Sequence, residues 1–167
     1  MIPVTLDPSR LRLAVAGNGP AAARRLARLR AAGADPLALA AADPATLPRL
    51  DCLWIADLAL EPATRLAAAA RAGGILVNVE DRPELCDFRN AAELRRGDLL
   101  IAVSTGGQSP GLAAAVRDRI AALFGPEWAA RVAALGARRR AWRAAGSSLP
   151  ELARLTAALL ARSGWLA

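Results

Sequence analysis

The sequence contains no histidine, no lysine and no tyrosine, so all 22 of its basic side chains are arginine. These absences exclude a lysine Schiff base, a P-loop lysine, a histidine general base and a tyrosine general acid. Acid–base chemistry is left to the 15 carboxylates, the two cysteines or a group from outside the chain. Metal ligation by histidine is also excluded, and we predict no metal-binding residues.

Long apolar runs are missing as well. No stretch of about 18 uncharged apolar residues occurs, which argues against a membrane span, and the opening "MIPVTLDPSR" lacks the pattern of a signal peptide. Cys52 and Cys86 have a spacing unlike that of a zinc ribbon or a redox pair, so we expect two reduced, buried thiols. The expected location is cytoplasmic.

The formal net charge is +7, which raises the question of nucleic-acid binding. The arginines are spread along the chain, however, and the aromatic residues are only four Trp and two Phe. No RNA-binding or helix-turn-helix signature stands out. We therefore expect no nucleic-acid partner, since a small polyanion would explain the charge equally well.

Apolar strands alternate with helical stretches over the first two thirds of the chain. The expected strands cover 11–16, the weak stretch "DPLALAA" after Gly33, 52–56, 75–79 and 98–103. The expected helices between them cover 21–32 and 61–72. This alternation predicts βαβ units and a parallel sheet, which is the α/β class with a Rossmann-like arrangement.

A glycine-rich turn follows the first expected strand and opens the first expected helix. It fits the pattern G-x-G-x-x-A, in which Gly17 permits a tight turn and Gly19 lets the backbone approach a pyrophosphate. The helix N-terminus adds its free N–H groups. We favour dinucleotide binding, with an empty Rossmann scaffold as the alternative. The candidate cofactor-binding residues are Gly17, Asn18, Gly19, Pro20, Ala21, Ala41, Ala42 and Asp43.

Asp43 is the first carboxylate after the second expected strand. It either contacts a ribose hydroxyl or caps the following turn, and the sequence leaves both interpretations open. No arginine cluster stands beside it, which favours NAD slightly over NADP.

Three amphipathic helices are expected beyond residue 110, over 112–124, 128–142 and 149–162. This part is too short to bury all of its apolar faces by itself. Trp128, Val132, Leu135 and Trp142 recur at helical spacing, and we expect them in a homodimer interface or in the adjoining core. The predicted organisation is an NAD-binding domain over 1–111 and a helical dimerisation and substrate-covering region over 112–167.

Two polar loops follow the fourth and the last expected strands. The first is "NVEDRPELCDF" (78–88), and the second is "STGGQS" (104–109), where Ser109 is also expected to cap the next helix. Because the C-terminal ends of parallel strands face the ligand crevice, we expect both loops at the mouth of one cleft.

With "AGNGPAAARRLARLRAAGA", "VNVEDRPELCDF" and "RRGDLLIAVSTGGQSPGLAAAVRDRI", the chain resembles the precorrin-2 dehydrogenase/sirohydrochlorin ferrochelatase family, the dehydrogenase–chelatase module of siroheme synthase. The resemblance implies NAD-dependent oxidation of precorrin-2 to sirohydrochlorin, followed in many members by insertion of Fe²⁺ as a substrate metal. An arginine-rich chain suits such a polycarboxylate tetrapyrrole. The alternative function is a non-catalytic module that binds a dinucleotide or a tetrapyrrole.

The resemblance also implies roles for individual residues. The family's functional aspartate falls on Asp81, which we expect to act as general base; the alternative is an aspartate that caps the loop before Arg82. The family's Ser/Thr-Gly-Gly loop lies along the substrate cleft. The expected substrate-binding residues are Asn78, Ser104, Thr105, Gly106, Gly107 and Ser109.

Overall fold

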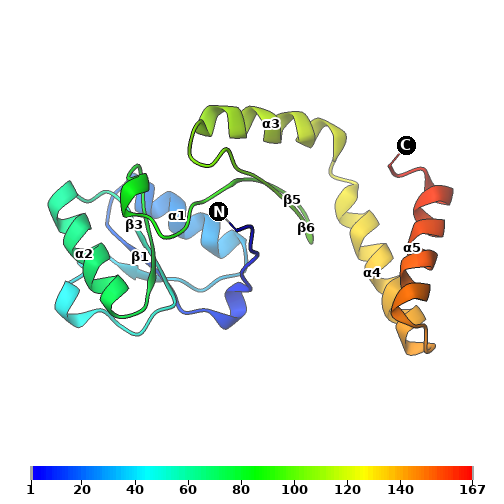
Figure 1. The fold of residues 1–167 in the computed structure, drawn as a ribbon, viewed down its shortest axis with the longest axis horizontal. Helices are drawn as coiled ribbons and strands as arrows, with labels where there is room; N and C mark the ends of the chain where they lie inside the picture. Colours follow the sequence, from blue (N-terminus) through cyan, green and yellow to red (C-terminus); the bar gives the residue numbers. More distant parts are fainter. Residues whose placement is uncertain (1, 167) are drawn as a thin grey trace. The chain divides into compact units, whose positions relative to one another are not determined.

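The computed structural model describes residues 2–166, which divide into two compact units. The first unit ends at Asn90 and the second begins at Ala91 (Figure 1). This division falls earlier in the chain than the one expected after residue 111, because residues 92–103 group with the C-terminal helices. Within residues 2–166, no helix is long and apolar enough to cross a bilayer.

The first unit is built on a four-stranded parallel sheet in the order β2-β1-β3-β4. Its strands are β1 (Leu13–Ala16), β2 (Leu37–Leu39), β3 (Cys52–Ile55) and β4 (Leu76–Val79). Its helices are α1 (Pro20–Ala31) and α2 (Leu60–Ala72), with three 3-10 turns, η1 (Pro8–Arg10), η2 (Pro44–Thr46) and η3 (Pro83–Leu85). The predicted parallel sheet between helices is confirmed.

Alternating side chains of the central strands build two separate cores. Leu13 and Val15 of β1 face the same layer as Ala22 of α1, whereas Ala14 and Ala16 pack with α2 residues such as Leu66. Each strand of the pair β1 and β3 is buried on both faces, which explains why both read as continuous apolar runs. The result is a three-layer arrangement, with the sheet between α1 and α2 (Figure 1).

The strand order reverses between β1 and β3. The chain leaves β1 towards β2 on one side, and β3 and β4 are added on the other side. The turn after β1 and the turn after β3 therefore meet at the C-terminal edge of the sheet. In open α/β sheets this reversal point is where ligands bind.

The second unit joins a β-hairpin to three helices. β5 (Ala92–Arg96) pairs antiparallel with β6 (Leu99–Val103), and α3 (Pro110–Leu123), α4 (Trp128–Ala144) and α5 (Leu149–Ser163) follow. The expectation that 98–103 is a further strand of the parallel sheet was wrong. It pairs with β5, which the sequence analysis missed, across a turn in which Gly97 has a φ of +57°. A Gly-Asp turn between two short strands is a hairpin signal.

The helices of this unit have their own core. Trp128 is 8% exposed and packs against Phe124 and Trp165, with ring centroids 4.9 and 6.5 Å apart. Leu152 and Leu159 of α5 are buried, and Ser148 opens that helix with a capping box. Of the four residues expected in an interface or core, Trp128 is therefore a core residue. The other three, Val132, Leu135 and Trp142, are half-buried.

Candidate active site

The glycine-rich turn lies at the reversal point of the first unit. Gly17 is buried with a φ of +129°, its N–H donates to Leu39 O at 3.0 Å, and a Cβ there would collide with the carbonyl of Ala56. Only glycine suits that conformation. Gly19 is the N-cap of α1, which begins at Pro20 as a G-x-G-x-x-A pattern requires. The turn therefore has the backbone geometry that the sequence predicts.

A carboxylate from the turn after β3 occupies the N-terminus of α1. Asp57 directly follows Ala56 at the end of β3, and its two oxygens accept hydrogen bonds from Ala21 N at 3.3 Å and Ala22 N at 2.8 Å. Its backbone is in the left-handed region, with a φ of +58°. Asp57 is not among the residues expected to bind the cofactor. The available signal was its place at the C-terminal end of a strand next to the reversal point.

This contact bears directly on whether a dinucleotide fits the turn. The glycines and the helix terminus suit the close approach of a pyrophosphate. The carboxylate of Asp57, however, holds two of the N–H groups that would receive it, and a phosphate there would meet a second negative charge. In the observed conformation of Asp57, the pyrophosphate does not fit.

The second half of the expected cofactor site follows β2. The carboxylate of Asp43 accepts a hydrogen bond from Ala45 N at 2.9 Å and caps the 3-10 turn η2. Of the two interpretations of Asp43, the observed hydrogen bond agrees with the one in which its carboxylate caps the following turn. Ala41 is exposed and Ala42 is half-buried just before it. A contact of Ala41, Ala42 or Asp43 with a ribose stays a prediction.

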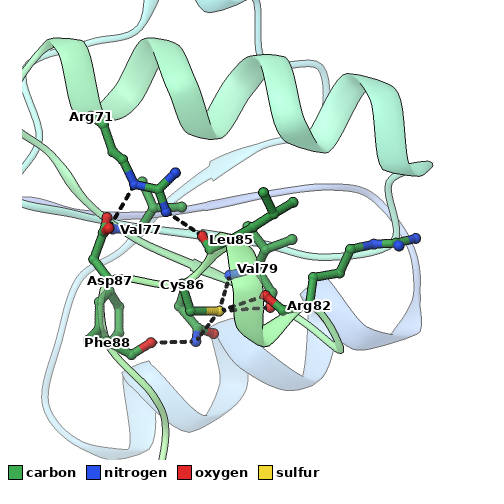
Figure 2. Close-up of polar contacts among 9 residues, drawn as sticks. Arg71, Val77, Val79, Arg82, Leu85, Cys86, Asp87 and Phe88 are labelled. Carbon is green, nitrogen blue, oxygen red and sulfur yellow. Dashed lines mark hydrogen bonds and ion pairs between the residues drawn. The ribbon is translucent and has the colours of Figure 1, made fainter. Parts of the chain in front are cut away.

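The loop after β4 is fastened to the sheet by its own side chains (Figure 2). Asp87 accepts a hydrogen bond from Val77 N at 2.9 Å and pairs with Arg71 of α2 at 2.7 Å, while its own N–H donates to Val77 O. Arg71 also donates to Leu85 O at 2.6 Å. These bonds join α2, β4 and the end of the loop, and they fix the path of residues 80–86.

Cys86 reinforces the same loop from inside. Its sulfur accepts a hydrogen bond from Val79 N at 3.2 Å and lies 3.2 Å from the carbonyl oxygens of Val79 and Arg82. Cys52, the other thiol, is buried in β3, and burial raises the pKa of that thiol, which keeps it protonated. A buried, protonated thiol is a poor general base, which strengthens the case for a carboxylate.

Asn78 is a buried residue of β4 that binds the end of this loop. Its amide nitrogen donates to Phe88 O at 2.9 Å, and its amide oxygen accepts from Asn90 at 2.9 Å. Asn90 in turn accepts from the indole of Trp54 at 3.1 Å. Asn78 therefore positions the loop through both ends of its amide, and its expected contact with substrate stays a prediction.

Asp81 lies in the turn that directly follows β4. It is exposed, it follows β4 at the C-terminal edge of the sheet, and its φ of +59° places it in the left-handed region. Aspartate and asparagine tolerate this region better than other non-glycine residues. The loop thus holds a solvent-accessible carboxylate at the ligand edge of the sheet, as expected for a proton acceptor.

The second polar loop belongs to the second unit and is shaped by local bonds. Thr105 Oγ1 accepts from Ser109 N at 3.1 Å, and Ser109 Oγ caps α3 by accepting from Leu112 N at 3.2 Å. Gly106 and Gly107 have φ values of +68° and +85°. Ser104 Oγ accepts from Gly106 N at 3.3 Å. The predicted cap by Ser109 is confirmed, and the expected contacts of this loop with substrate stay predictions.

The premise that both polar loops end strands of one sheet was wrong, because β6 pairs with β5 in a separate two-stranded sheet. Within the first unit, Asp57 bonds to the turn at Ala21 and Ala22, and Glu80 of the loop after β4 lines a hollow together with Ala21. A row of arginines also lies here: Arg24, Arg25 and Arg28 of α1 line a small hollow together with Glu80. Such guanidinium groups suit carboxylate ligands.

Two protein-family models match the chain. The family described as "Putative NAD(P)-binding" matches residues 40–92, and "Sirohaem biosynthesis protein central" matches residues 96–123. The first match covers β3, β4 and the loop with Asp81, and the second covers β6, the Gly106–Gly107 loop and α3. The glycine-rich turn lies before both matches.

Curated relatives point the same way. The siroheme synthase of Methylococcus capsulatus is 36% identical over 142 residues, which are 71% of this chain and 30% of that protein. The siroheme synthase of Thiobacillus denitrificans is 32% identical over 161 residues, or 84% of this chain and 33% of that protein. The chain thus spans about a third of the length of these relatives.

A solved structure shares the fold. The protein titled "SirC, precorrin-2 dehydrogenase" superposes with a TM-score of 0.75 over 100% of this chain and 93% of that chain, at 18% sequence identity. At this identity the likeness concerns the fold. The matches together confirm the resemblance that the sequence motifs indicated.

Proposed function

Because this chain is related to the siroheme synthases, we propose that it oxidises precorrin-2 to sirohydrochlorin, with NAD⁺ as the hydride acceptor. The observation that carries the proposal is the similarity to siroheme synthases over 161 residues, which extends through both units. The likeness of fold to a precorrin-2 dehydrogenase supports it. We favour NAD over NADP because the residues after β2, Ala41 to Asp43, include no arginine.

The residues of this chain have distinct tasks in the proposed reaction. The bound nicotinamide supplies the site that accepts a hydride. Asp81, exposed in the turn at the start of a loop that Asp87 and Cys86 hold to the sheet, accepts the proton that leaves the tetrapyrrole. Arg24 and Arg28 of α1 attract the carboxylates of the substrate.

We extend the proposal to a second reaction at the same carboxylate. Insertion of Fe²⁺ into sirohydrochlorin releases two pyrrole protons, and Asp81 is the exposed base that we assign to accept them one after the other and to pass each to water. Fe²⁺ is a substrate in this reaction and not a resident metal. The test is the visible spectrum of sirohydrochlorin mixed anaerobically with Fe²⁺ and protein: conversion no faster than without protein would limit the chain to the oxidation.

We also propose that the chain acts as a cytoplasmic homodimer. Three large apolar side chains lie exposed along one face of α3, with exposed fractions of 56% for Leu112, 40% for Val116 and 67% for Leu123. Such a face is suited to burial against a second copy. The two free cysteines, Cys52 and Cys86, suit a reducing compartment.

The decisive experiment is an assay of NADH formation with enzymatically generated precorrin-2. We expect an increase in absorbance from NADH together with the spectrum of sirohydrochlorin, both dependent on protein and NAD⁺. The rival function, a module that binds without catalysis, predicts a spectral shift of added sirohydrochlorin and no NADH. Absence of both signals with folded protein would contradict the proposal and its rival alike.

A further inference from the structure

The N-terminus of α1 has two amide groups that the helix itself leaves free. Pro20 has no N–H, and Ala23 N donates to Gly19 O at 3.1 Å. The amides of Ala21 and Ala22 remain, and they are the donors that a helix terminus offers to an anion. Both donate to the same carboxylate, that of Asp57, at 3.3 and 2.8 Å.

The space that Gly19 leaves open is filled by the same group. A Cβ placed on Gly19 would lie 2.5 Å from Cγ of Asp57 and 2.7 Å from one of its oxygens. In the G-x-G-x-x-A pattern, the second glycine is small so that a pyrophosphate can come close to the backbone. Here the carboxylate of Asp57 lies close to the backbone of Gly19, in the space that this small residue leaves.

Asp57 can nevertheless leave the turn. The residue is exposed, so its carboxylate can rotate into water. It lies outside α1, on the neighbouring turn after β3, so its departure leaves the glycine turn in place. The exchange costs the two hydrogen bonds to Ala21 and Ala22, which an incoming phosphate would replace.

We propose that Asp57 is an internal anion that competes with the dinucleotide pyrophosphate for the N-terminus of α1, and so sets the affinity for the cofactor. A dinucleotide binds only when the carboxylate withdraws, because two negative charges cannot share the two amides. This inference rests on the proposed function, since it concerns the cofactor site of that reaction. It identifies Asp57 as a specificity-determining residue that lowers affinity for phosphate groups at this turn.

The test compares NAD⁺ binding by the parent protein and by two variants of the full chain, measured by titration calorimetry. Asp57→Asn keeps the size and the tolerance of a positive φ but removes the charge, and Asp57→Gly removes the side chain at a φ that glycine accepts. We expect both variants to bind NAD⁺ at least tenfold more tightly, which equals about 1.4 kcal/mol. Thermal unfolding, followed by circular dichroism, verifies that each variant is folded.

Two further variants locate the effect. Asp7→Asn is the matched control, because Asp7 is an exposed carboxylate that caps the short turn η1 by accepting from Ser9 N at 3.0 Å. We expect its affinity for NAD⁺ to equal that of the parent within twofold. In the double variant Asp57→Gly/Gly19→Val, the gain should disappear, because the valine side chain fills the space that the carboxylate left.

The outcomes separate this inference from the proposed function. Unchanged or weaker NAD⁺ binding in both Asp57 variants overturns the inference, even if the parent forms NADH from precorrin-2. Tighter binding in the variants, with no NADH formed by any of the proteins, supports the inference and overturns the proposed function. If no protein binds NAD⁺, both are overturned.

Discussion

Replacing Asp81 by asparagine should remove most of the oxidation of precorrin-2 and leave the fold unchanged. The side chain is exposed in the turn after β4, so the substitution buries nothing and opens no cavity. Its φ of +59° is one that asparagine adopts as readily as aspartate. The folded structure therefore tolerates Asp81→Asn, and the change removes the proton acceptor alone.

The expected magnitudes differ widely for the two roles that Asp81 can have. A surface substitution without strain changes the free energy of unfolding by about 0.5 kcal/mol or less. Loss of a general base lowers the rate by roughly 10²–10⁴, or about 3–5.5 kcal/mol in activation free energy. A loop-capping role would instead cost about 1 kcal/mol of stability and leave the rate at the parent value.

The assay follows NADH formation from precorrin-2 and the melting temperature of the same preparations. Glu84→Gln is the matched control, because Glu84 is an exposed carboxylate of the same loop that has no part in the proposed chemistry. We expect the control to retain the parent rate. Equal rates for Asp81→Asn and the parent would refute the assignment, and so would an equal loss of rate in Glu84→Gln.

Four other expectations are open to direct measurement. Gly19→Val should weaken NAD⁺ binding at least tenfold in calorimetry, because its side chain would fill the turn that the pyrophosphate approaches; equal affinity in a folded variant would exclude this turn as the site. Asp87→Asn should lower the free energy of unfolding by about 1–2 kcal/mol, since it weakens the bonds to the arginine of α2 and the backbone of β4; urea unfolding measures this. The guanidinium of Arg12 lowers the pKa of Asp51 from 3.8 to about 2. This pair therefore stabilises the fold above pH 3.8, and the stabilisation is lost as the pH falls through about 2. The melting temperature of Asp51→Asn should depend less on pH in that window than the melting temperature of the parent. Leu123→Arg should shift the mass in light scattering from dimer to monomer, and a monomeric parent at tens of micromolar would contradict the proposed assembly.

The β-hairpin of the second unit shows where pattern reasoning fell short. The stretch 99–103 is apolar and was correctly identified as a strand, but its partner was not. β5 reads "AELRR", which has few of the β-branched and aromatic residues that are typical of strands, and its burial comes from Leu94. Pairing across the Gly97 turn, together with packing against α3, makes this segment a strand. That stabilisation is tertiary, so local preference does not reveal it.

In the candidate site, too, some residues could be predicted from the sequence and others could not. The glycine pattern and the polar loop after β4 were identified from residue types, because a positive φ at Gly17 and exposed carboxylates after a strand follow from local chemistry. The roles of Asn78, Cys86 and Asp87 as fasteners of the loop became visible only through their bonds to β4, Phe88 and Arg71. The residue types of the loop are readable from the sequence. The hydrogen bonds of the folded chain decide which of these side chains remain exposed to a ligand.

By itself, the sequence determined the α/β class, the alternation of strands and helices that makes a parallel sheet, and a chemistry limited to carboxylates and arginines. These follow from periodicity and composition, which are properties of neighbouring residues. The tertiary structure alone decided that β6 pairs with β5 outside the parallel sheet. It alone also decided that the side chain of Asp57 binds the N-terminus of α1. Asp57 lies more than 30 residues from the amides that it binds, at Ala21 and Ala22. Such a contact arises only because parallel β1 and β3 are adjacent and end at the same edge of the sheet.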